Sequence, residues 1–319
     1  MTETRDSTVI VTGALGQDGW YLSKLLAGRG FSVLGTSHRF VSDTRPDYLN
    51  EMVTLDLSDS SAVDALIKVS RPSMVFHLGC RSSSSQLFDD PLSTSDINGL
   101  SVVRLLEAIR RHSPGTRLFF ASSSEVFARS RLSPQDESTP FAPRNAYGAA
   151  KAFGQMMVAA YREQFGLYAC SGVLFNHESP RRPPHYVTRK VTSAVARIAA
   201  GGKERVLLGD LQACRDWGYA GDFVRGMFMM LQNKVPEDFV LATGRTHSVA
   251  DLCQVAFSSV GLDYANHVDQ SPELLRTGEV ITLVGNAEKA RATLGWYPEV
   301  EFGELIQMMV RADRQALCR

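Results

Sequence analysis

Short apolar runs and longer amphipathic segments alternate through the first half of the chain. The runs are typical of buried parallel strands, and the segments, with apolar residues every three or four positions, are typical of helices. Strands are predicted at residues 8–12, 31–36, 52–55, 74–78, 118–121 and 168–174, and helices at 19–27, 60–69, 96–111 and 147–165. This alternation predicts an α/β fold with a Rossmann-like, doubly wound parallel sheet covered by helices on both faces.

The segment 96–111 has the strongest helical periodicity. Its residues Leu100, Val103, Leu106 and Ile109 recur at helical spacing. We expect this apolar stripe to face the core.

The pattern changes after Phe175. Residues 176–184 are polar and rich in proline, so they form neither a helix nor a central strand. Further elements are predicted at 188–200 (helix), 206–208 (strand), 221–232 (helix), 239–242 (strand) and 304–311 (final helix). We predict a nucleotide-binding domain over residues 1–175, rejoined by about 218–245. A smaller C-terminal α/β substrate-binding lobe comprises 176–217 and 246–319.

Composition narrows the class of protein. Acidic and basic residues balance at 34 each, which argues against electrostatic attraction to nucleic acid or membrane. Five cysteines without a Cys-x-x-Cys pair read as reduced thiols, not as a zinc site or a disulfide framework. The first residues are polar, and no apolar run approaches the ~18 residues of a membrane span. We expect a cytoplasmic protein with no metal, nucleic-acid or membrane partner.

Three glycines follow the first predicted strand. Gly13, Gly16 and Gly19 lie between that strand and an amphipathic helix. A strand that turns on glycines into a helix N-terminus presents bare backbone and a positive dipole to a diphosphate. The spacing is that of short-chain dehydrogenases.

A second cluster suggests chemistry at the fifth predicted strand. Tyr147 and Lys151 lie one helical turn apart, so they share a face. A cation beside the phenol favours the phenolate and lowers the pKa of the tyrosine. The strand ends in the hydroxyl cluster 122–124 and Glu125, at the sheet edge where such folds place their reacting groups.

With these residues in view, the chain resembles the GDP-mannose 4,6-dehydratases of the extended short-chain dehydrogenase/reductase superfamily, almost end to end. The matching strings are TGALGQDG at 12–19, LFNHESPRR at 174–182, VTRK at 187–190, RDWG at 215–218, LATGRTHS at 241–248 and KARATLGW at 289–296.

The resemblance implies a mechanism. Tyr147, assisted by Lys151, would take the proton of the sugar 4-hydroxyl while a hydride passes from C4 to the nicotinamide. Ser123 would hydrogen-bond the 4-oxygen, and Glu125 would remove the C5 proton. Loss of the 6-hydroxyl as water and return of the hydride to C6 complete the reaction.

The resemblance also implies ligand-binding residues. For the cofactor they are Gly13, Leu15, Gly16, Gln17, Asp18, Gly19, Arg39, Asp56, Leu57, Leu78, Gly79, Tyr147, Lys151, Leu174, Asn176, His177 and Arg182. For the GDP-sugar they are Ser124, Asn176, Val187, Lys190, Arg215, Arg276 and Glu279. Residues 35–39 carry no carboxylate and end in Arg39, which favours NADP over NAD because arginine accommodates a 2′-phosphate.

The chain departs from the family pattern at four places. Ser123 replaces a threonine, and a Pro-Pro pair at 183–184 replaces a glycine. Arg81 stands where relatives have a neutral glutamine, and Leu87 where a serine faces the sugar. The last two changes lie on the substrate side and can alter the hexose accepted or the step at which the reaction stops.

Three functions therefore stay open. The leading one is a 4,6-dehydratase acting on GDP-mannose or a close GDP-sugar. The second is a GDP-4-keto-sugar reductase or another nucleotide-sugar epimerase or decarboxylase. The third is a non-catalytic NADP-binding protein, against which the set Ser123, Glu125, Tyr147 and Lys151 argues.

The resemblance also bears on assembly. Relatives pair through the helices predicted here at 96–111 and 147–165, which implies a homodimer. A homotetramer through the loop after the second strand is the alternative, and that loop is altered at 38–43.

Overall fold

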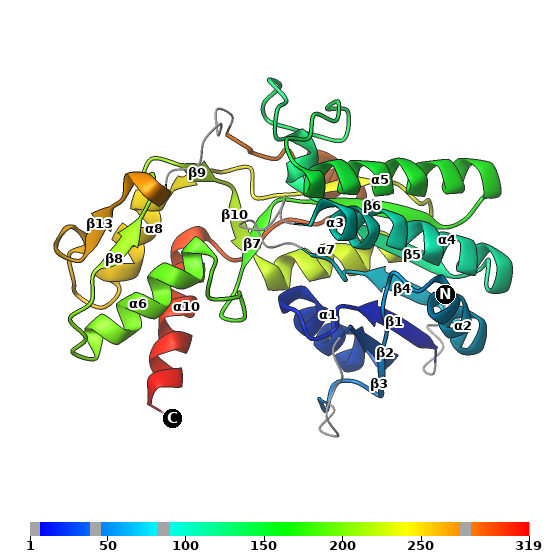
Figure 1. The fold of residues 1–319 in the computed structure, drawn as a ribbon, viewed down its shortest axis with the longest axis horizontal. Coiled ribbons are helices and arrows are strands. Elements are labelled where there is room, and N and C mark those ends of the chain that lie inside the picture. Colours follow the sequence, from blue (N-terminus) through cyan, green and yellow to red (C-terminus); the bar gives the residue numbers. More distant parts are fainter. Residues whose placement is uncertain (1–6, 39–45, 82–89, 275–281, 319) are drawn as a thin grey trace.

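A seven-stranded parallel sheet forms the centre of the protein (Figure 1). The computed structural model describes residues 7–38, 46–81, 90–274 and 282–318. The strand order is β11-β6-β5-β4-β1-β2-β3. The strands are β1 (Thr8–Thr12), β2 (Ser32–Ser37), β3 (Glu51–Thr54), β4 (Met74–His77), β5 (Arg117–Ala121), β6 (Ala169–Leu174) and β11 (Phe239–Leu241). The order reverses between β1 and β4, the place where such sheets open a ligand crevice.

Helices cover both faces of this sheet. On one face α1 (Gln17–Gly28) packs against α7 (Ala220–Gln232), with α9 (Glu288–Leu294) beside α7. On the other face lie α2 (Ser60–Ser70), α4 (Ser101–His112) and α5 (Ala146–Phe165). Except for the edge strand β3, the strands are largely buried between two apolar layers, as their continuous apolar runs predict.

The predicted helix at 96–111 is not one regular helix. It consists of a π-helical turn (Asp96–Leu100) followed by α4, and α3 (Pro91–Ser95) precedes it. Leu100 is 46% exposed, so the prediction that it faces the core is wrong. The π turn adds a residue to the helical turn and rotates the preceding residues relative to α4. The buried face of α4 is instead formed by Val102, Leu105, Leu106 and Ile109.

The C-terminal part has its own apolar core. It is formed by α6 (Val187–Ala199), α8 (Val249–Ser258) and α10 (Phe302–Leu317). α10 extends beyond the predicted end at residue 311. Short strands complete this part: β8 (Val206–Leu208) with β13 (Val268–Gln270), and β9 (Cys214–Arg215) with β12 (His247–Ser248).

A small two-stranded sheet lies between the two parts in Figure 1. Its strands are β7 (Asn176–Glu178) and β10 (Trp217–Tyr219), which run parallel. The polar segment after Phe175 leaves the central sheet as predicted, yet its first residues form this extra strand. After the first excursion the chain returns, because β11 pairs with β6. Within the described ranges, no helix has the length and apolarity needed to cross a bilayer.

Candidate active site

The glycine cradle (Gly13, Gly16 and Gly19) runs from the end of β1 into the first turn of α1. Gly13 has a φ of +70°, and a Cβ placed on it would lie 3.0 Å from the Gly79 Cα. A Cβ on Gly19 would lie 2.3 Å from the Gly13 carbonyl oxygen. Both positions therefore require glycine. Gly16 is the exposed N-cap of α1, and no side chain caps its turn. The cradle thus offers a helix N-terminus to an anion, as a diphosphate requires.

Hydrogen bonds join the ends of β1 and β4 across the crevice. The Thr12 hydroxyl accepts from the backbone N–H of Leu78 (3.1 Å) and Gly79 (2.9 Å). A Cβ on Gly79 would lie 2.7 Å from a Leu57 methyl group, so the Leu57 side chain packs directly against Gly79 at the edge of the crevice. The exposed carboxylate of Asp56 accepts from Ser58, and these hydrogen bonds lower the pKa of Asp56.

Three reacting groups predicted from the sequence meet where β5 ends and α5 begins. The Ser123 side chain hydrogen-bonds Tyr147, and the backbone N–H of Glu125 donates to the Ser123 hydroxyl (3.3 Å). A Cβ on Gly148 would lie 2.6 Å from the Glu125 carbonyl oxygen, so α5 begins directly against this turn. We call this region the catalytic corner; the buried Ser124 lies within its turn.

Asn145 holds the carboxylate of Glu125. Its Nδ2 donates to Glu125 Oε2 at 2.9 Å, while its Oδ1 accepts from the backbone N–H of Gly148 at 2.8 Å. One side chain therefore caps α5 and positions the candidate base. Asn145 is not among the site residues predicted from the sequence. Its place immediately before the helix is a typical N-cap signal that would have identified it.

Lys151 is buried one turn after Tyr147. Its Nζ donates to the Ala121 carbonyl oxygen (2.7 Å) and lies 4.7 Å from the centre of the Phe120 ring and 5.8 Å from that of Tyr147. Burial lowers the pKa of Lys151. Burial and repulsion from Lys151 lower the pKa of His77 to about 3, so His77 is neutral.

The pKa of Tyr147 is raised well above its usual range. Burial is the main cause, and Cys80 and Glu125 act in the same direction, while the Ser123 hydrogen bond opposes them. The expectation of a lowered pKa for this phenol is wrong for this arrangement, because burial outweighs the Ser123 hydrogen bond. Cys80, predicted from the sequence only as a reduced thiol, also acts electrostatically to raise the pKa of Lys151, against the larger effect of burial.

The end of β6 and the segment after it carry several of the residues predicted to bind the cofactor. Leu174 ends β6, and Asn176 begins β7. Arg182 pairs with the buried Glu178 (3.1 Å), and its guanidinium lies 3.6 Å from the centre of the Tyr186 ring.

Val187, Lys190 and Arg215, which are predicted to bind the GDP-sugar, belong to the C-terminal part. Val187 begins α6. The exposed Lys190 donates to the Leu207 carbonyl oxygen (2.6 Å), and the half-buried Arg215 on β9 donates to the Cys214 carbonyl oxygen (2.8 Å). Arg39, Leu87, Arg276 and Glu279 lie outside the described residues.

Asp216 fixes the chain next to Arg215. Its buried carboxylate accepts from the backbone N–H of Thr243 (2.9 Å), Gly244 (3.0 Å) and Gly285 (3.2 Å). Burial raises the pKa of Asp216, and these hydrogen bonds oppose the rise. The hydrogen bonds of Asp216 therefore fix the backbone next to Arg215.

Arg81 does not extend freely toward the crevice. Its Nη1 pairs with Asp90 (3.0 Å) and donates to the Ser93 hydroxyl. Its backbone N–H and carbonyl both bond the Asn98 side chain (3.0 and 3.1 Å). The guanidinium is thereby held at the N-terminus of α3.

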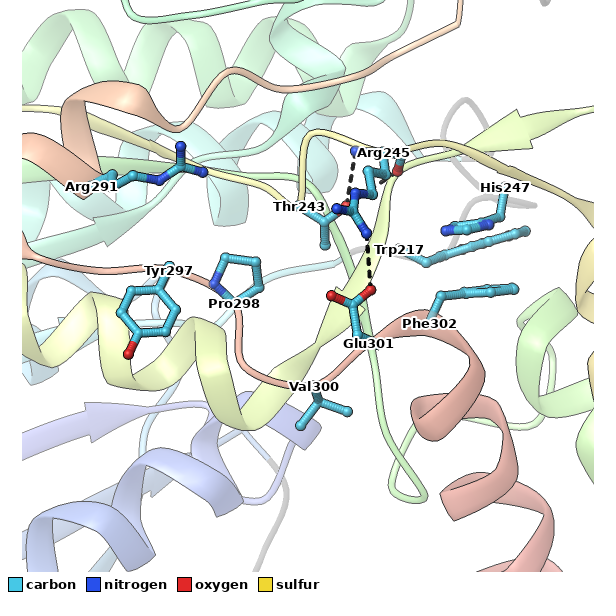
Figure 2. A pocket seen from close by; sticks show the side chains of 10 residues that line it. All are labelled: Trp217, Thr243, Arg245, His247, Arg291, Tyr297, Pro298, Val300, Glu301 and Phe302. Atoms are coloured by element: carbon cyan, nitrogen blue, oxygen red, sulfur yellow. Dashed lines mark hydrogen bonds and ion pairs between the residues drawn. The ribbon is translucent and has the colours of Figure 1, made fainter.

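Figure 2 shows a separate cavity of about 180 Å³ between the central sheet and the C-terminal part. The His247 and Phe302 rings stack at 3.9 Å, and Arg245 pairs with Glu301 (3.2 Å). The lining residues are Trp217, Thr243, Arg245, His247, Arg291, Tyr297, Pro298, Val300, Glu301 and Phe302. None of them belongs to the site predicted from the sequence. Among the described residues, no cluster of potential metal ligands was found.

Known proteins share both sequence and fold with this chain. A family model described as GDP-mannose 4,6 dehydratase matches residues 10–309. GDP-mannose 4,6 dehydratase 1 of Arabidopsis thaliana is 40% identical, covering 95% of this chain and 89% of that protein. GDP-mannose 4,6-dehydratase of Yersinia enterocolitica is 38% identical, covering 96% and 93%.

Two solved structures illustrate the shared fold. UDP-glucose 4-epimerase of Thermus thermophilus, in complex with NAD, superposes with a TM-score of 0.84 at 26% identity, covering 97% of this chain and 99% of that one. RMD of Pseudomonas aeruginosa, complexed with NADPH, gives a TM-score of 0.82 at 20% identity, covering 98% of each chain.

Proposed function

The chain belongs to the GDP-mannose 4,6-dehydratase family and is a lyase of that type; we propose that it converts GDP-mannose or a close GDP-hexose to the GDP-4-keto-6-deoxy sugar. The observation that carries this proposal is the carboxylate of Glu125, held by Asn145 beside the Ser123–Tyr147 pair. A reductase needs only the hydroxyl pair, whereas an elimination also needs a base.

Each residue of the catalytic corner has its own proposed role in proton transfer or hydrogen bonding. Tyr147 takes the proton of the sugar 4-hydroxyl, and Ser123 donates a hydrogen bond to the 4-oxygen. The C4 ketone acidifies the C5 proton, which Glu125 removes and passes to the departing 6-hydroxyl, so that water leaves. Once C6 has been reduced, C5 takes up a proton, and the 4-hydroxyl proton that Tyr147 gives up balances it and restores the phenolate. When bound, an oxidised nicotinamide would accept the C4 hydride, return it to C6 and add a positive charge that lowers the pKa of Tyr147.

We further propose NADP as the cofactor. The glycine cradle and the Leu57–Gly79 contact fit a dinucleotide, because a Cβ at Gly13 or Gly19 would collide with backbone. At the end of β2 the described residues, through His38, include no carboxylate to bond a ribose 2′-hydroxyl. Arg39 follows and suits a 2′-phosphate. A dissociation constant for NADP at least tenfold below that for NAD supports this choice; the reverse order overturns it.

The C-terminal lobe, residues 176–217 and 246–319, is proposed to bind the nucleotide sugar. Lys190 and Arg215 donate to main-chain carbonyl oxygens, which a diphosphate would replace with charge-assisted hydrogen bonds. Arg276 and Glu279 are proposed to contribute from the same side.

We propose a homodimer that pairs through the π turn, α4 and α5, with a homotetramer as the alternative. Apolar side chains are exposed along these elements: Leu100, Phe153, Met156 and Phe165. Such a set suits a two-fold interface, where the same patch covers itself. A molar mass of two chains by light scattering, reduced to one by Met156→Glu, supports the proposal, and a wild-type monomer contradicts it.

A cytoplasmic location is proposed from the free thiols. The cysteines that the structure describes form no disulfide bond, which is typical of a reducing compartment.

The activity is tested by mass spectrometry of GDP-mannose incubated with purified protein and NADP in catalytic amount. A product lighter by one water, formed without net NADPH, is expected. Conversion only of a 4-keto sugar at the expense of added NADPH would instead show a reductase. Unchanged GDP-mannose with NADP bound would move the search to other GDP-sugars.

A further inference from the structure

A largely buried group of contacts joins the start of α1 to strand β7, with the Asp18 side chain partly exposed. His177 Nε2 lies 2.9 Å from Asp18 Oδ2. Gln17 Nε2 donates to the His177 carbonyl oxygen (3.0 Å) and to Asp18 Oδ1 (3.1 Å), and the Ser179 hydroxyl donates to Gln17 Oε1 (2.8 Å). These side chains tie the helix turn after the glycine cradle to the strand that leads into the C-terminal lobe.

The hydrogen-bond partners determine the charge of His177. Its Nδ1 lies 2.7 Å from the Phe175 carbonyl oxygen, and its Nε2 faces the Asp18 carboxylate. Both partners are acceptors, so each ring nitrogen must carry a hydrogen to satisfy both contacts. A neutral imidazole would leave one buried contact without a proton, which is costly. The contacts therefore select the imidazolium.

The surroundings of His177 support this charge. Its ring stacks on Phe223 of α7 at 4.6 Å, so that face is apolar. The charged groups around it are Asp18 from α1 and Arg182, which pairs with Glu178. Burial lowers the pKa of His177, but attraction to Asp18 outweighs it and the net pKa is raised. Burial likewise raises the pKa of Asp18, and His177 outweighs it, so the net pKa is lowered.

We propose that His177 is a positioning residue that acts as a cation. It forms an ion pair with Asp18, so that the first turn of α1 accepts the diphosphate of the cofactor. An uncompensated carboxylate in that turn would repel a diphosphate, and the imidazolium cancels its charge. This role rests on the proposed function of the glycine cradle. It differs from a direct contact between His177 and the cofactor.

The ion pair between His177 and Asp18 exists only within a defined pH range. Because the folded-state pKa of His177 is raised, its contribution is complete below the ordinary histidine pKa of ~6.5 and is lost as pH rises through the folded-state value. Because the pKa of Asp18 is lowered, the opposite loss occurs only in acid, as pH falls through its folded-state value. The affinity for NADP should therefore fall on the alkaline side, in step with deprotonation of His177.

Two substitutions separate charge from geometry. In Asp18→Asn the amide can donate to a neutral His177 Nε2 while its oxygen still accepts from Gln17, so the contacts persist without charge. In His177→Gln the carboxylate of Asp18 stays uncompensated. We expect His177→Gln to weaken NADP binding about tenfold at neutral pH, equivalent to ~1.4 kcal/mol. Both variants should lose the alkaline fall in affinity that the wild type shows.

The direct test is nitrogen NMR of the full chain with ¹⁵N-labelled histidine and no ligand. His177→Gln assigns the signal, and a resonance with both ring nitrogens protonated at neutral pH is expected, lost in Asp18→Asn. A neutral tautomer at that pH would overturn the proposal, as would an NADP affinity that does not follow the titration. A wild type that binds no NADP would overturn the proposed cofactor and the positioning role, while the NMR signal reads the charge independently.

Discussion

The catalytic corner and the lobe proposed to bind the substrate hold their proposed functional side chains in different ways. In the catalytic corner, backbone contact at Gly148 and the Asn145–Glu125 hydrogen bond fix the reacting groups. On the lobe side, Lys190 and Arg215 bond main-chain carbonyl oxygens that a ligand can replace. In the proposed function the chemistry therefore depends on tight packing, whereas the choice of sugar depends on the exposed Lys190 and the half-buried Arg215, which can change independently.

The largest expected effect is that of Tyr147→Phe. The variant removes the proton acceptor of the 4-hydroxyl and should lower kcat about 10³-fold, within the usual range for a general acid–base. Folding and NADP binding should persist, because the lost hydroxyl bonds only Ser123 among the contacts described for it. Steady-state rates and NADP titration of the same preparation measure both. A variant that retains more than a tenth of the wild-type kcat would exclude Tyr147 as the base.

Glu125→Gln separates the two halves of the reaction. The amide keeps the size of the side chain but cannot take the C5 proton, so kcat should fall about 10²-fold or more. Oxidation at C4 should continue, so reduced cofactor should accumulate on the protein and appear in its near-ultraviolet absorbance. Unchanged elimination would mean that another group is the base.

Gly19→Ala tests the packing of the cradle. Its Cβ would lie 2.3 Å from the Gly13 carbonyl oxygen, so we expect a loss of ~1–3 kcal/mol in the free energy of unfolding and weaker NADP binding. Gly28→Ala in the same helix is the matched control, since nothing lies within 4 Å of its Cβ. Urea unfolding measures the free energy of unfolding of both variants. Equal values for Gly19→Ala and Gly28→Ala would contradict tight packing around Gly19.

Arg215→Gln tests whether the C-terminal lobe binds the diphosphate of the substrate. Loss of a charge-assisted contact with the diphosphate should raise the KM for GDP-mannose about 10- to 100-fold while kcat changes little. Arg205→Gln in the same lobe is the control, because Arg205 pairs with Asp269 outside the proposed site. Equal KM values for the two variants would remove Arg215 from the site.

Arg81→Gln should have the smallest effect. Its ion pair with Asp90 is about half exposed, so its loss should change stability by no more than ~1 kcal/mol. The KM for GDP-mannose should stay within a few-fold of the wild-type value. An increase as large as that of Arg215→Gln would mean that the guanidinium leaves Asp90 and contacts the sugar.

The sequence predicts the sheet well because apolar runs and glycines are local signals. Strand β1 has the predicted bounds of 8–12, and β11 returns to the central sheet as its apolar residues suggest. The exposure of Leu100 was missed, because a π turn leaves no periodic signal in the sequence. The extent of α10 was also missed, since its last turns are polar.

The site could be predicted in its residue types but not in its contacts. The family resemblance points to Ser123, Glu125 and Tyr147, and the structure brings them together. The direction of the Tyr147 pKa and the pairing of Arg81 with Asp90 depend on burial and on chain segments far apart in sequence. Such contacts exist only after folding.

The central claim is that one protein oxidises C4, eliminates water and returns the same hydride to C6. GDP-mannose carrying deuterium at C4 tests it most directly, with catalytic NADP and mass spectrometry of the product. The account predicts that the deuterium is retained at C6 of the 4-keto-6-deoxy sugar. A product without deuterium, or deuterium found in released NADPH, would contradict it.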